Sequence, residues 1–239
     1  MNIELGKRII YCDSSCIIVN KIAGEAAEGA KAGMTDLPKQ LLEISALPSA
    51  NDALEFPAAV HRLDVPVTGC SVFARTKTAL CFLNEKFKTN CVKKIYWAVV
   101  EKPDNDIINK INEKNTEFIH WIQFNAKQNK SIAFSEEGEG RKKAKLRCRL
   151  AGEGRDYLFM EIELITGRHH QIRAQFEHLG LHIKGDLKYG SRRSEKNGGI
   201  RLHARSITFP NPANPRKLIY AEAVPLPEDN LWLAFQEIQ

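Results

Sequence analysis

Three short segments carry polar side chains at positions where a hydrophobic core would not need them. In HRLDVPVTG, Asp64 follows Arg62 and precedes Pro66, so a tight turn should hold its carboxylate. In KKIYWAVVEK, Tyr96 lies on a predicted strand, and in LITGRHHQIRAQF, Arg168 lies where a strand ends and a helix begins. Each residue alone could be structural. Together, a carboxylate, a phenol and a guanidinium in a basic chain are what a nucleic-acid-modifying pocket needs.

The charge balance of the chain favours a polyanionic partner. Its 239 residues hold 35 Lys and Arg against 29 Asp and Glu, which gives a net charge of +6 and a pI near 9.0. The positive charge is concentrated in segments 86–94, 140–149 and 189–196. These segments could converge on one surface, or they could be three unrelated loops.

Composition excludes several classes of protein. A hydrophobic fraction of 43% is too high for a disordered chain. No apolar run approaches the roughly 20 residues of a membrane span, and the first residues lack the apolar stretch of a secretory signal, so we expect a cytoplasmic protein. The six cysteines contain no CxxC pair and are expected to be reduced. His178 and His182 are separated by Gly180, so we expect no metal site.

The elements that must position these residues form an α+β pattern. A hairpin is predicted over 8–21, and a strand followed by a helix over 72–90. Within 33–46 we expect a helix that begins after Thr35 or Asp36 as its cap. A strand over 93–103 and a polar connection over 104–118 come next. Further predictions are a hairpin of 144–150 with 157–167, a helix over 169–180, and strands over 200–209 and 217–225. Antiparallel hairpins with interspersed helices indicate α+β rather than repeated βαβ units.

These motifs, in this order, resemble the RluA-type pseudouridine synthases. HRLDVPVTG is similar to that family's HRLD signature, IYWAVVEK to its tyrosine-containing strand, and ITGRHHQIRAQF with GDLKYG to its arginine motif and the segment after it. RLHARSITFPNP resembles its late strand, and the likeness runs from about Arg8 to Pro225. The resemblance implies a pseudouridine synthase fold: a mainly antiparallel mixed sheet flanked by helices, with a central basic cleft. It also implies a single catalytic domain over 1–239, with no separate RNA-binding domain of the S4 type.

The resemblance also implies a reaction and a role for each residue. RNA uridine would be isomerised to pseudouridine: the glycosidic bond breaks, the uracil turns, and its C5 atom bonds to the sugar. Asp64 would be the essential catalytic residue, Arg168 its ion-pair partner, and Tyr96 a support for the target base. Arg62 would fill the place vacated by the flipped nucleotide. No cofactor and no metal would be needed, and ribosomal and transfer RNA are both open as substrates.

The chemistry of these side chains is consistent with such roles. A neighbouring guanidinium favours the ionised form of a carboxylate, and arginine pairs with it through a planar fork that lysine cannot copy. Extruding a stacked base costs a few kcal/mol, and stacking on Tyr96 could return roughly 1–3 kcal/mol of this. The residues predicted to contact RNA are His61, Arg62, Lys93, Lys94, Arg141, Lys142, Lys143, Arg173, Arg192 and Arg193. With no apolar stripe left over, we expect a monomer.

The sequence departs from the family pattern at two places beside the expected pocket. Val67 stands where the family commonly has Thr, and His169 where it often has Thr after the arginine. Both departures could affect the choice of substrate.

Two alternatives stay open. The first is a catalytically silent RNA-binding or assembly factor with the same fold, although phosphate binding alone has no use for a carboxylate in a basic groove. The second is a retaining glycosidase or a nucleosidase, which would need a second acid near Asp64; Asp186 is the candidate.

Overall fold

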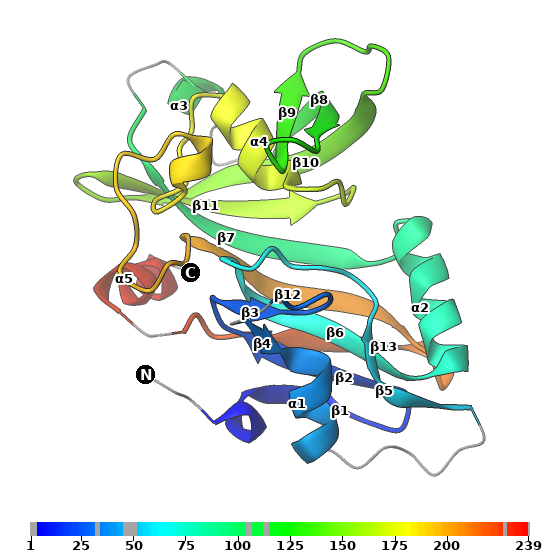
Figure 1. Ribbon diagram of the computed structural model, residues 1–239. Helices are drawn as coiled ribbons and strands as arrows, with labels where there is room; N and C mark the ends of the chain where they lie inside the picture. Colours follow the sequence, from blue (N-terminus) through cyan, green and yellow to red (C-terminus); the bar gives the residue numbers. More distant parts are fainter. Residues whose placement is uncertain are drawn as a thin grey trace. The chain divides into compact units, whose positions relative to one another are not determined.

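The computed structural model describes residues 4–31, 34–44, 52–103, 107–111, 115–226 and 229–238 (Figure 1). The chain divides into two compact units. The first unit comprises Met1–Lys94 and Ala204–Pro227, and the second comprises Ile95–His203 and Glu228–Gln239.

The first unit is built on a sheet whose pairs β1–β2, β2–β6, β5–β6 and β12–β13 are antiparallel. Within it the strands follow the order β1-β2-β6-β12, with β5 paired to β6 and β13 paired to β12. Their bounds are β1 Ile9–Cys12, β2 Cys16–Lys21, β5 Ala53–Ala59, β6 Thr68–Thr76, β12 Leu202–Asn211 and β13 Asn214–Glu222. A short parallel pair, β3 (Glu25–Ala26) and β4 (Thr35–Asp36), stands apart from them. The helical segments are the 3-10 turn η1 (Leu5–Arg8), α1 (Leu37–Ile44) and α2 (Lys77–Lys88).

Strands β2 and β6 are buried on both faces because helices cover each side. Successive residues of a strand point to opposite faces. Ile17 and Val19 accordingly pack with Leu37 of α1, whereas Ile18 packs with Leu83 of α2. The near-continuous apolar run of β2 follows from this double burial and ends at Lys21.

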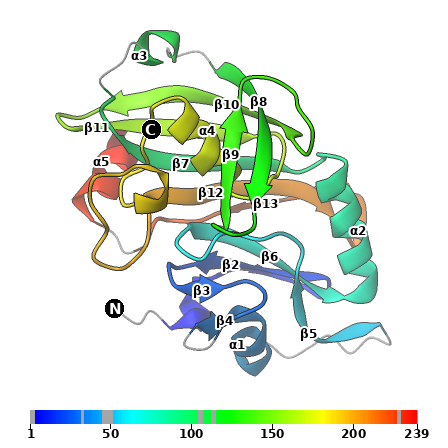
Figure 2. The ribbon, with the colours of Figure 1, turned by 45° about the horizontal axis from the view of Figure 1, so that its top comes forward.

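The second unit is an antiparallel sheet in the order β7-β11-β10-β8-β9 (Figure 2). The strands are β7 Lys93–Glu101, β8 Thr116–Asn125, β9 Lys130–Phe134, β10 Lys142–Glu153 and β11 Tyr157–Leu164. The first two residues of β7 belong to the first unit. The helical segments are α3 Ile107–Lys110, α4 Gln171–His178, the 3-10 turn η2 Leu187–Tyr189 and α5 Asn230–Ile238.

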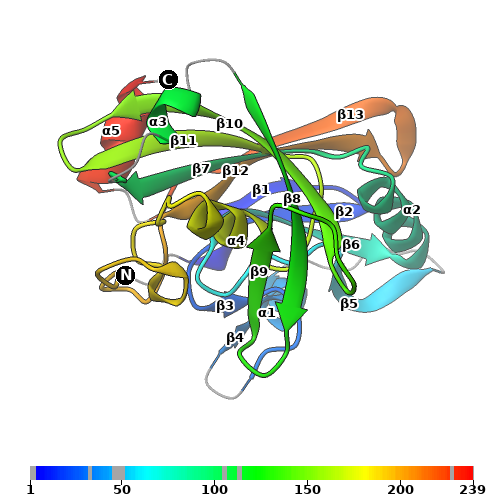
Figure 3. The same ribbon diagram turned by 90° about the horizontal axis from the view of Figure 1, so that it is seen from above.

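Helices α4 and α5 cover opposite faces of the second unit's sheet. Figure 3 shows α4 beside the β8–β9 hairpin and α5 beside the β10–β11 hairpin. Ala144 packs with Ala174 of α4, whereas Val99 and Phe159 pack with Phe235 of α5. The strand register places Tyr96 on the α4 face. Paired residues of neighbouring strands lie on the same face, and Tyr96 pairs with Ile162, which in turn pairs with Cys148. Cys148 is an even-numbered residue of β10, and these residues face α4.

Most predicted elements are confirmed. The hairpins over 8–21 and 144–167, the helices α1, α2 and α4, and the two late strands all form as expected. The prediction of a polar connection over 104–118 is wrong at its end, because β8 begins at Thr116. The β8–β9 hairpin, β5 and α5 were not predicted. The single catalytic domain stays a prediction.

No helix among the described residues is both long and apolar enough to span a membrane.

Candidate active site

The HRLD segment forms the turn between β5 and β6. The backbone N–H of Val67 donates to the carbonyl of Asp64 at 2.9 Å, which closes the turn that the sequence predicted. Leu63 and Val67 are buried and anchor the turn at both ends, while Asp64 is half-buried and Arg62 is exposed. The turn therefore fixes the backbone of Asp64 and leaves Arg62 in contact with solvent.

A buried lysine is hydrogen-bonded to the backbone of this turn. The side chain of Lys21 is fully buried, and its Nζ donates to the carbonyl oxygens of Asp64 at 3.2 Å, Val65 at 3.0 Å and Val67 at 2.7 Å. A fourth carbonyl, that of Ile22, lies at 3.2 Å. Burial lowers the pKa of Lys21 to about 8, and the neighbouring carboxylates of Glu25 and Asp64 oppose this decrease.

A buried ion pair lies behind Lys21. Arg8 donates to Glu25 through two nitrogens, at 2.6 and 2.9 Å, and both side chains are almost fully buried. Glu25 also accepts the backbone N–H of Ile22 at 2.9 Å. A network of charges thus stabilises the Asp64 turn. The carboxylate of Glu25 stabilises the ammonium of Lys21, and this ammonium donates hydrogen bonds to the backbone carbonyls around Asp64. Sequence reasoning missed Lys21 and Glu25; the one available signal was a lysine ending an otherwise apolar strand.

Glycine is required directly after the turn. Gly69 has a φ of +110°, and a Cβ atom at this position would lie 2.3 Å from the carbonyl oxygen of Ala204. Only glycine permits this backbone conformation and this close approach of two strands. Gly69 also pairs with Lys21 in the β2–β6 register, so the turn and its lysine support are set by the same strand pair.

Arg168 lies at the junction of β11 and α4, as predicted. Its Nε donates to the carbonyl of Lys143 at 3.0 Å, and its backbone N–H donates to Oε1 of Gln171 at 3.0 Å. Gln171 also accepts from the hydroxyl of Thr166 at 2.8 Å. Arg168 is exposed, and its two Nη groups carry four further N–H donors. Arg168 is therefore held in place in a way that leaves its fork available to an anion.

Tyr96 is a buried residue of β7, only 6% exposed. Its neighbour in the sheet is Ile162 of β11. The phenol therefore has a defined position on the face of the second unit that also carries α4.

Two predicted RNA contacts are structural residues instead. Arg173 is buried and forms a bidentate ion pair with Asp186, at 2.6 and 2.7 Å, with its guanidinium over the ring of Tyr189. Asp186 is the acid considered above for glycosidase chemistry. It is only 1% exposed, and its carboxylate is already paired with Arg173. Lys94 is also buried, which lowers its pKa to about 8, and its Nζ lies 6.0 Å from the ring centre of Phe87.

His61 has a structural role too. Its Nε2 accepts the backbone N–H of Val72 at 3.2 Å, and its ring stacks on Phe87 at 4.9 Å. Burial, with a smaller effect of the Lys94 charge, lowers the pKa of His61 to about 3. A neutral imidazole that already accepts a hydrogen bond has no charge to offer a phosphate, which argues against an ionic contact with RNA; the predicted contact stays a prediction.

The predicted basic cluster of 141–143 does not share one surface. Lys142 and Lys143 are both exposed, but they pair with Ile122 and Trp121 and so point to opposite faces of β10. Lys142 lies on the face that carries Tyr96. Arg141 is half-buried, and its guanidinium stacks over Phe134 at 3.7 Å.

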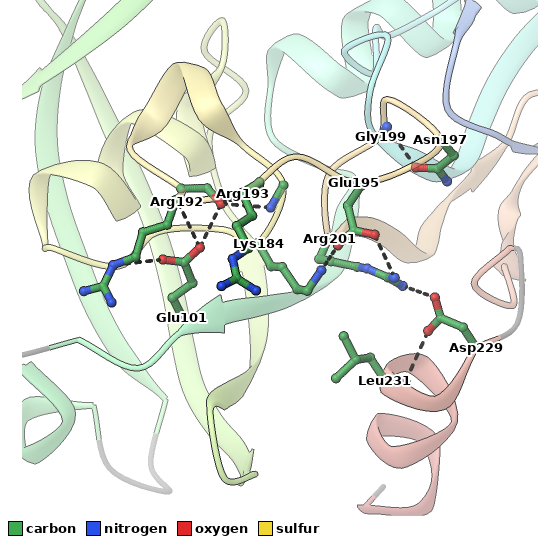
Figure 4. Close-up of polar contacts among 12 residues, drawn as sticks. Glu101, Lys184, Arg192, Arg193, Glu195, Asn197, Gly199, Arg201, Asp229 and Leu231 are labelled. Carbon is green, nitrogen blue, oxygen red and sulfur yellow. Dashed lines mark hydrogen bonds and ion pairs between the residues drawn. The ribbon is translucent and has the colours of Figure 1, made fainter.

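Acidic residues anchor the loop that carries the third basic segment (Figure 4). Arg201 pairs with Glu195 at 3.0 Å and with Asp229 at 2.6 Å, so it links the loop to the start of α5. Glu101 accepts the backbone N–H of Arg192 at 3.1 Å, and Nε of Arg192 lies 3.9 Å from the same carboxylate. The loop is therefore held by ion pairs.

The remaining predicted cations lie on the surface. Arg192 and Arg193 are exposed on the anchored loop, and Lys93 is exposed at the start of β7. Within the described residues no cluster of three or more His, Cys, Asp or Glu side chains could hold a metal ion. All six cysteines are free thiols.

Comparison with known proteins decides the family. A family model described as RNA pseudouridylate synthase matches residues 15–178, a segment that includes Lys21, the Asp64 turn, Tyr96 and Arg168. The chain belongs to this family. It is an isomerase that acts on uridine in RNA.

Curated relatives have similar sequences. An uncharacterized RNA pseudouridine synthase of Zymomonas mobilis is 30% identical over 94% of this chain and 95% of its own length. The ribosomal large subunit pseudouridine synthase C of Vibrio parahaemolyticus is 29% identical over 88% of this chain and 64% of its own length. This chain therefore spans a little under two thirds of that second relative.

Solved structures share the fold. Human RNA Pseudouridylate Synthase Domain Containing 4 matches with a TM-score of 0.71 and 19% identity, covering 98% of this chain and 93% of that one. Human RNA Pseudouridylate Synthase Domain Containing 1 matches with a TM-score of 0.68 and 22% identity, covering 95% and 86%. The α+β pseudouridine synthase fold expected from the sequence is thereby confirmed.

Proposed function

We propose that this pseudouridine synthase modifies ribosomal RNA and that Asp64 carries out the chemistry. The relatives named ribosomal large subunit pseudouridine synthases support this class of substrate. The observation that carries the assignment of Asp64 is the support of its turn, in which Lys21 binds the carbonyls of Asp64, Val65 and Val67 while the Asp64 side chain stays half-buried. A turn bound so tightly holds a reactive group in one position, which is what catalysis by orientation needs.

Arg168 is proposed as the cation that pairs with Asp64 during the reaction. A guanidinium near a carboxylate stabilises its ionised form, which is the form able to act on the sugar or the base. The support for this role is that the backbone of Arg168 is bound by Gln171 and its Nε by the carbonyl of Lys143, while the side chain stays exposed. Arg168→Lys should therefore lower kcat, because lysine cannot form the planar bidentate pair.

Tyr96 and Arg62 are proposed to handle the extruded uridine. The target base is stacked in RNA and must leave the stack before it reacts. A buried phenol on a strand offers a ring of fixed position for the base, and the exposed Arg62, two residues before Asp64, can fill the gap. Lys93, Lys142, Arg192 and Arg193 remain proposed contacts to the RNA backbone.

The experiment that tests this function is release of tritium from RNA containing uridine labelled at C5. The unsubstituted protein is expected to release tritium from ribosomal RNA transcripts, while Asp64→Asn should bind the same RNA and release none. Asp156→Asn is the matched control, because Asp156 is an exposed acid that pairs with its neighbour Arg155. Release by Asp64→Asn would remove Asp64 from its role. Release from transfer RNA alone would correct the substrate, and tight binding without any release would identify a silent RNA-binding factor.

A further inference from the structure

An exposed aromatic pair lies directly beside Arg168 in the second unit. Phe124, near the end of β8, keeps 49% of its surface exposed, and its ring meets that of His169 edge-on at 4.4 Å. His169 is also exposed, and it follows Arg168 in the chain. Single exposed aromatic side chains are common, but an exposed pair adjoining a proposed catalytic arginine is a specific arrangement. We call these two residues the Phe124–His169 shelf.

Buried groups hold the shelf from below. His169 stacks on His170 at 3.8 Å, and its Nδ1 is hydrogen-bonded with the hydroxyl of Ser131 at 3.0 Å. Ser131 is the β9 partner of Phe124 in the strand register. His170 is in turn hydrogen-bonded with the hydroxyl of the buried Tyr189 at 2.9 Å. Both rings of the shelf are thus fixed by the sheet and by the loop before α4.

Two lysines lie at the β8–β9 turn, which follows Phe124, and a third begins β9. Lys127 is exposed in this turn, and Lys188 donates to the carbonyl of Asn129 at 3.2 Å, which brings a second ammonium to the same turn. Lys130 lies over the ring of Tyr189 at 4.8 Å and pairs with Glu177 at 2.7 Å. Aromatic rings bordered by cations are typical of surfaces that bind unpaired nucleic acid, since bases stack on the rings while phosphates contact the cations.

We propose that the Phe124–His169 shelf stacks an unpaired base of the RNA substrate other than the target uridine. The inference rests on the proposed function, because it assigns the target base to Tyr96 and Asp64. The base lies against the exposed ring surface of Phe124 and His169, and the backbone that follows it contacts Lys127 or Lys188.

Ultraviolet crosslinking followed by mass spectrometry tests the shelf without requiring turnover. The full-length protein carrying Asp64→Asn is irradiated with ribosomal RNA transcripts, and peptides that carry a nucleotide are identified. We expect a nucleotide on Phe124 or His169. Crosslinks confined to other residues would overturn the proposal. Because this measurement needs only binding, it stays informative if the protein forms no pseudouridine, which would instead refute the proposed function.

Kinetics of variants provide the second test. Phe124→Leu and His169→Thr should each raise KM for RNA about 5- to 100-fold, the range expected for loss of one stacked base, with kcat nearly unchanged. Phe124→Trp should retain a low KM, because it keeps a stacking ring. Leu218→Ala is the control, since Leu218 is an exposed apolar residue of β13, 68% exposed. An unchanged KM in Phe124→Leu, or equal effects of Phe124→Leu and Phe124→Trp, would refute stacking. If Phe124→Leu fails to fold, Phe124→Trp and the crosslinks decide.

Discussion

Replacing Lys21 by methionine should separate the stability of the fold from the geometry of the Asp64 turn. Lys21 is fully buried, and its pKa falls from 10.5 to about 8 because burial disfavours the charged form. This difference corresponds to about 3 kcal/mol of free energy that opposes the charged lysine in the folded state. Methionine has a similar length and no charge, so it removes this cost.

The same substitution also removes hydrogen bonds. Without Lys21, the carbonyls of Asp64 and Val65 keep the backbone N–H groups of Val67 and Gly24 as donors, at 2.9 and 3.0 Å. The carbonyl of Val67 loses its 2.7 Å bond to Nζ, and an unsatisfied buried acceptor costs about 1–3 kcal/mol. The two effects offset each other, so the free energy of unfolding at pH 7 should change by less than about 2 kcal/mol. Turnover should fall about 100-fold, because a shift of roughly 1 Å in a catalytic group has an effect of that size.

The pH dependence of stability gives an independent check. The unfolded chain keeps the Lys21 proton up to pH 10.5, whereas the folded protein releases it near pH 8. Between these values the unfolded state binds more protons, so the free energy of unfolding should rise with pH by about 3 kcal/mol from this residue. Lys21→Met should lack that rise. Urea unfolding from pH 7 to 10.5, with reductant present to protect the thiols, measures it.

A second buried lysine serves as the matched control. Burial also lowers the pKa of Lys94 to about 8, but its described contact is with Phe87 rather than with the Asp64 turn. Lys94→Met should therefore also make the free energy of unfolding rise less with pH. Unlike Lys21→Met, it should reduce kcat only slightly. If the free energy of unfolding depends on pH identically in the unsubstituted protein and in Lys21→Met, the lowered pKa of the buried Lys21 is refuted. Equal kcat values would refute the dependence of the turn on Lys21.

Three further substitutions test the structural assignments. Arg173→Ala should lower the free energy of unfolding by about 3–5 kcal/mol, because it leaves Asp186 buried without its partner, and RNA affinity measured on the folded protein should be unchanged. Gly69→Ala should destabilise by more than about 1–3 kcal/mol, since a Cβ there would overlap Ala204, and thermal unfolding would show a lower Tm. Lys142→Glu should weaken RNA binding and reduce the slope of the logarithm of the binding constant against the logarithm of salt concentration by at least about 1. Lys143→Glu, on the opposite face, should change the affinity and the slope less. Equal slopes for the two variants would contradict the assignment of faces.

The parts of the fold that the sequence predicts are those set by local patterns. Leu146, Cys148 and Leu150 alternate with charged residues, and this alternation gave the β10–β11 hairpin. The β8–β9 hairpin lacks such a signal, because its apolar residues fall on both faces: Ile122 and Phe124 lie on the α4 face, the first buried and the second exposed, whereas Ile119 lies on the other face. Its strands form because β8 pairs with β10, a contact between residues far apart in the sequence.

The positions of the candidate site residues were easier to predict than their partners. Pro66, two residues after Asp64, and Gly167, directly before Arg168, are local signals of a turn and of an element end, so both positions could be predicted. The partner of Arg173 is Asp186, thirteen residues away in a different segment, and no local pattern links them. Opposite faces for Lys142 and Lys143 could have been predicted, since adjacent residues of a strand always point apart.

Some of the chain's basic side chains are buried, so its composition overstates the number of cations that can contact RNA. Arg8, Lys21, Lys94 and Arg173 are all buried, and each contributes to the positive charge of the chain without facing solvent. Arg8 and Arg173 hold their positions through bidentate carboxylate pairs, and Lys21 through backbone carbonyls. Burying a charge is costly unless it is paired or hydrogen-bonded, so the bonded charges of Arg8, Lys21 and Arg173 mark places where the backbone must not move. Because Lys21 binds the turn that carries Asp64, part of the chain's positive charge serves to hold the proposed catalytic carboxylate in position rather than to attract RNA.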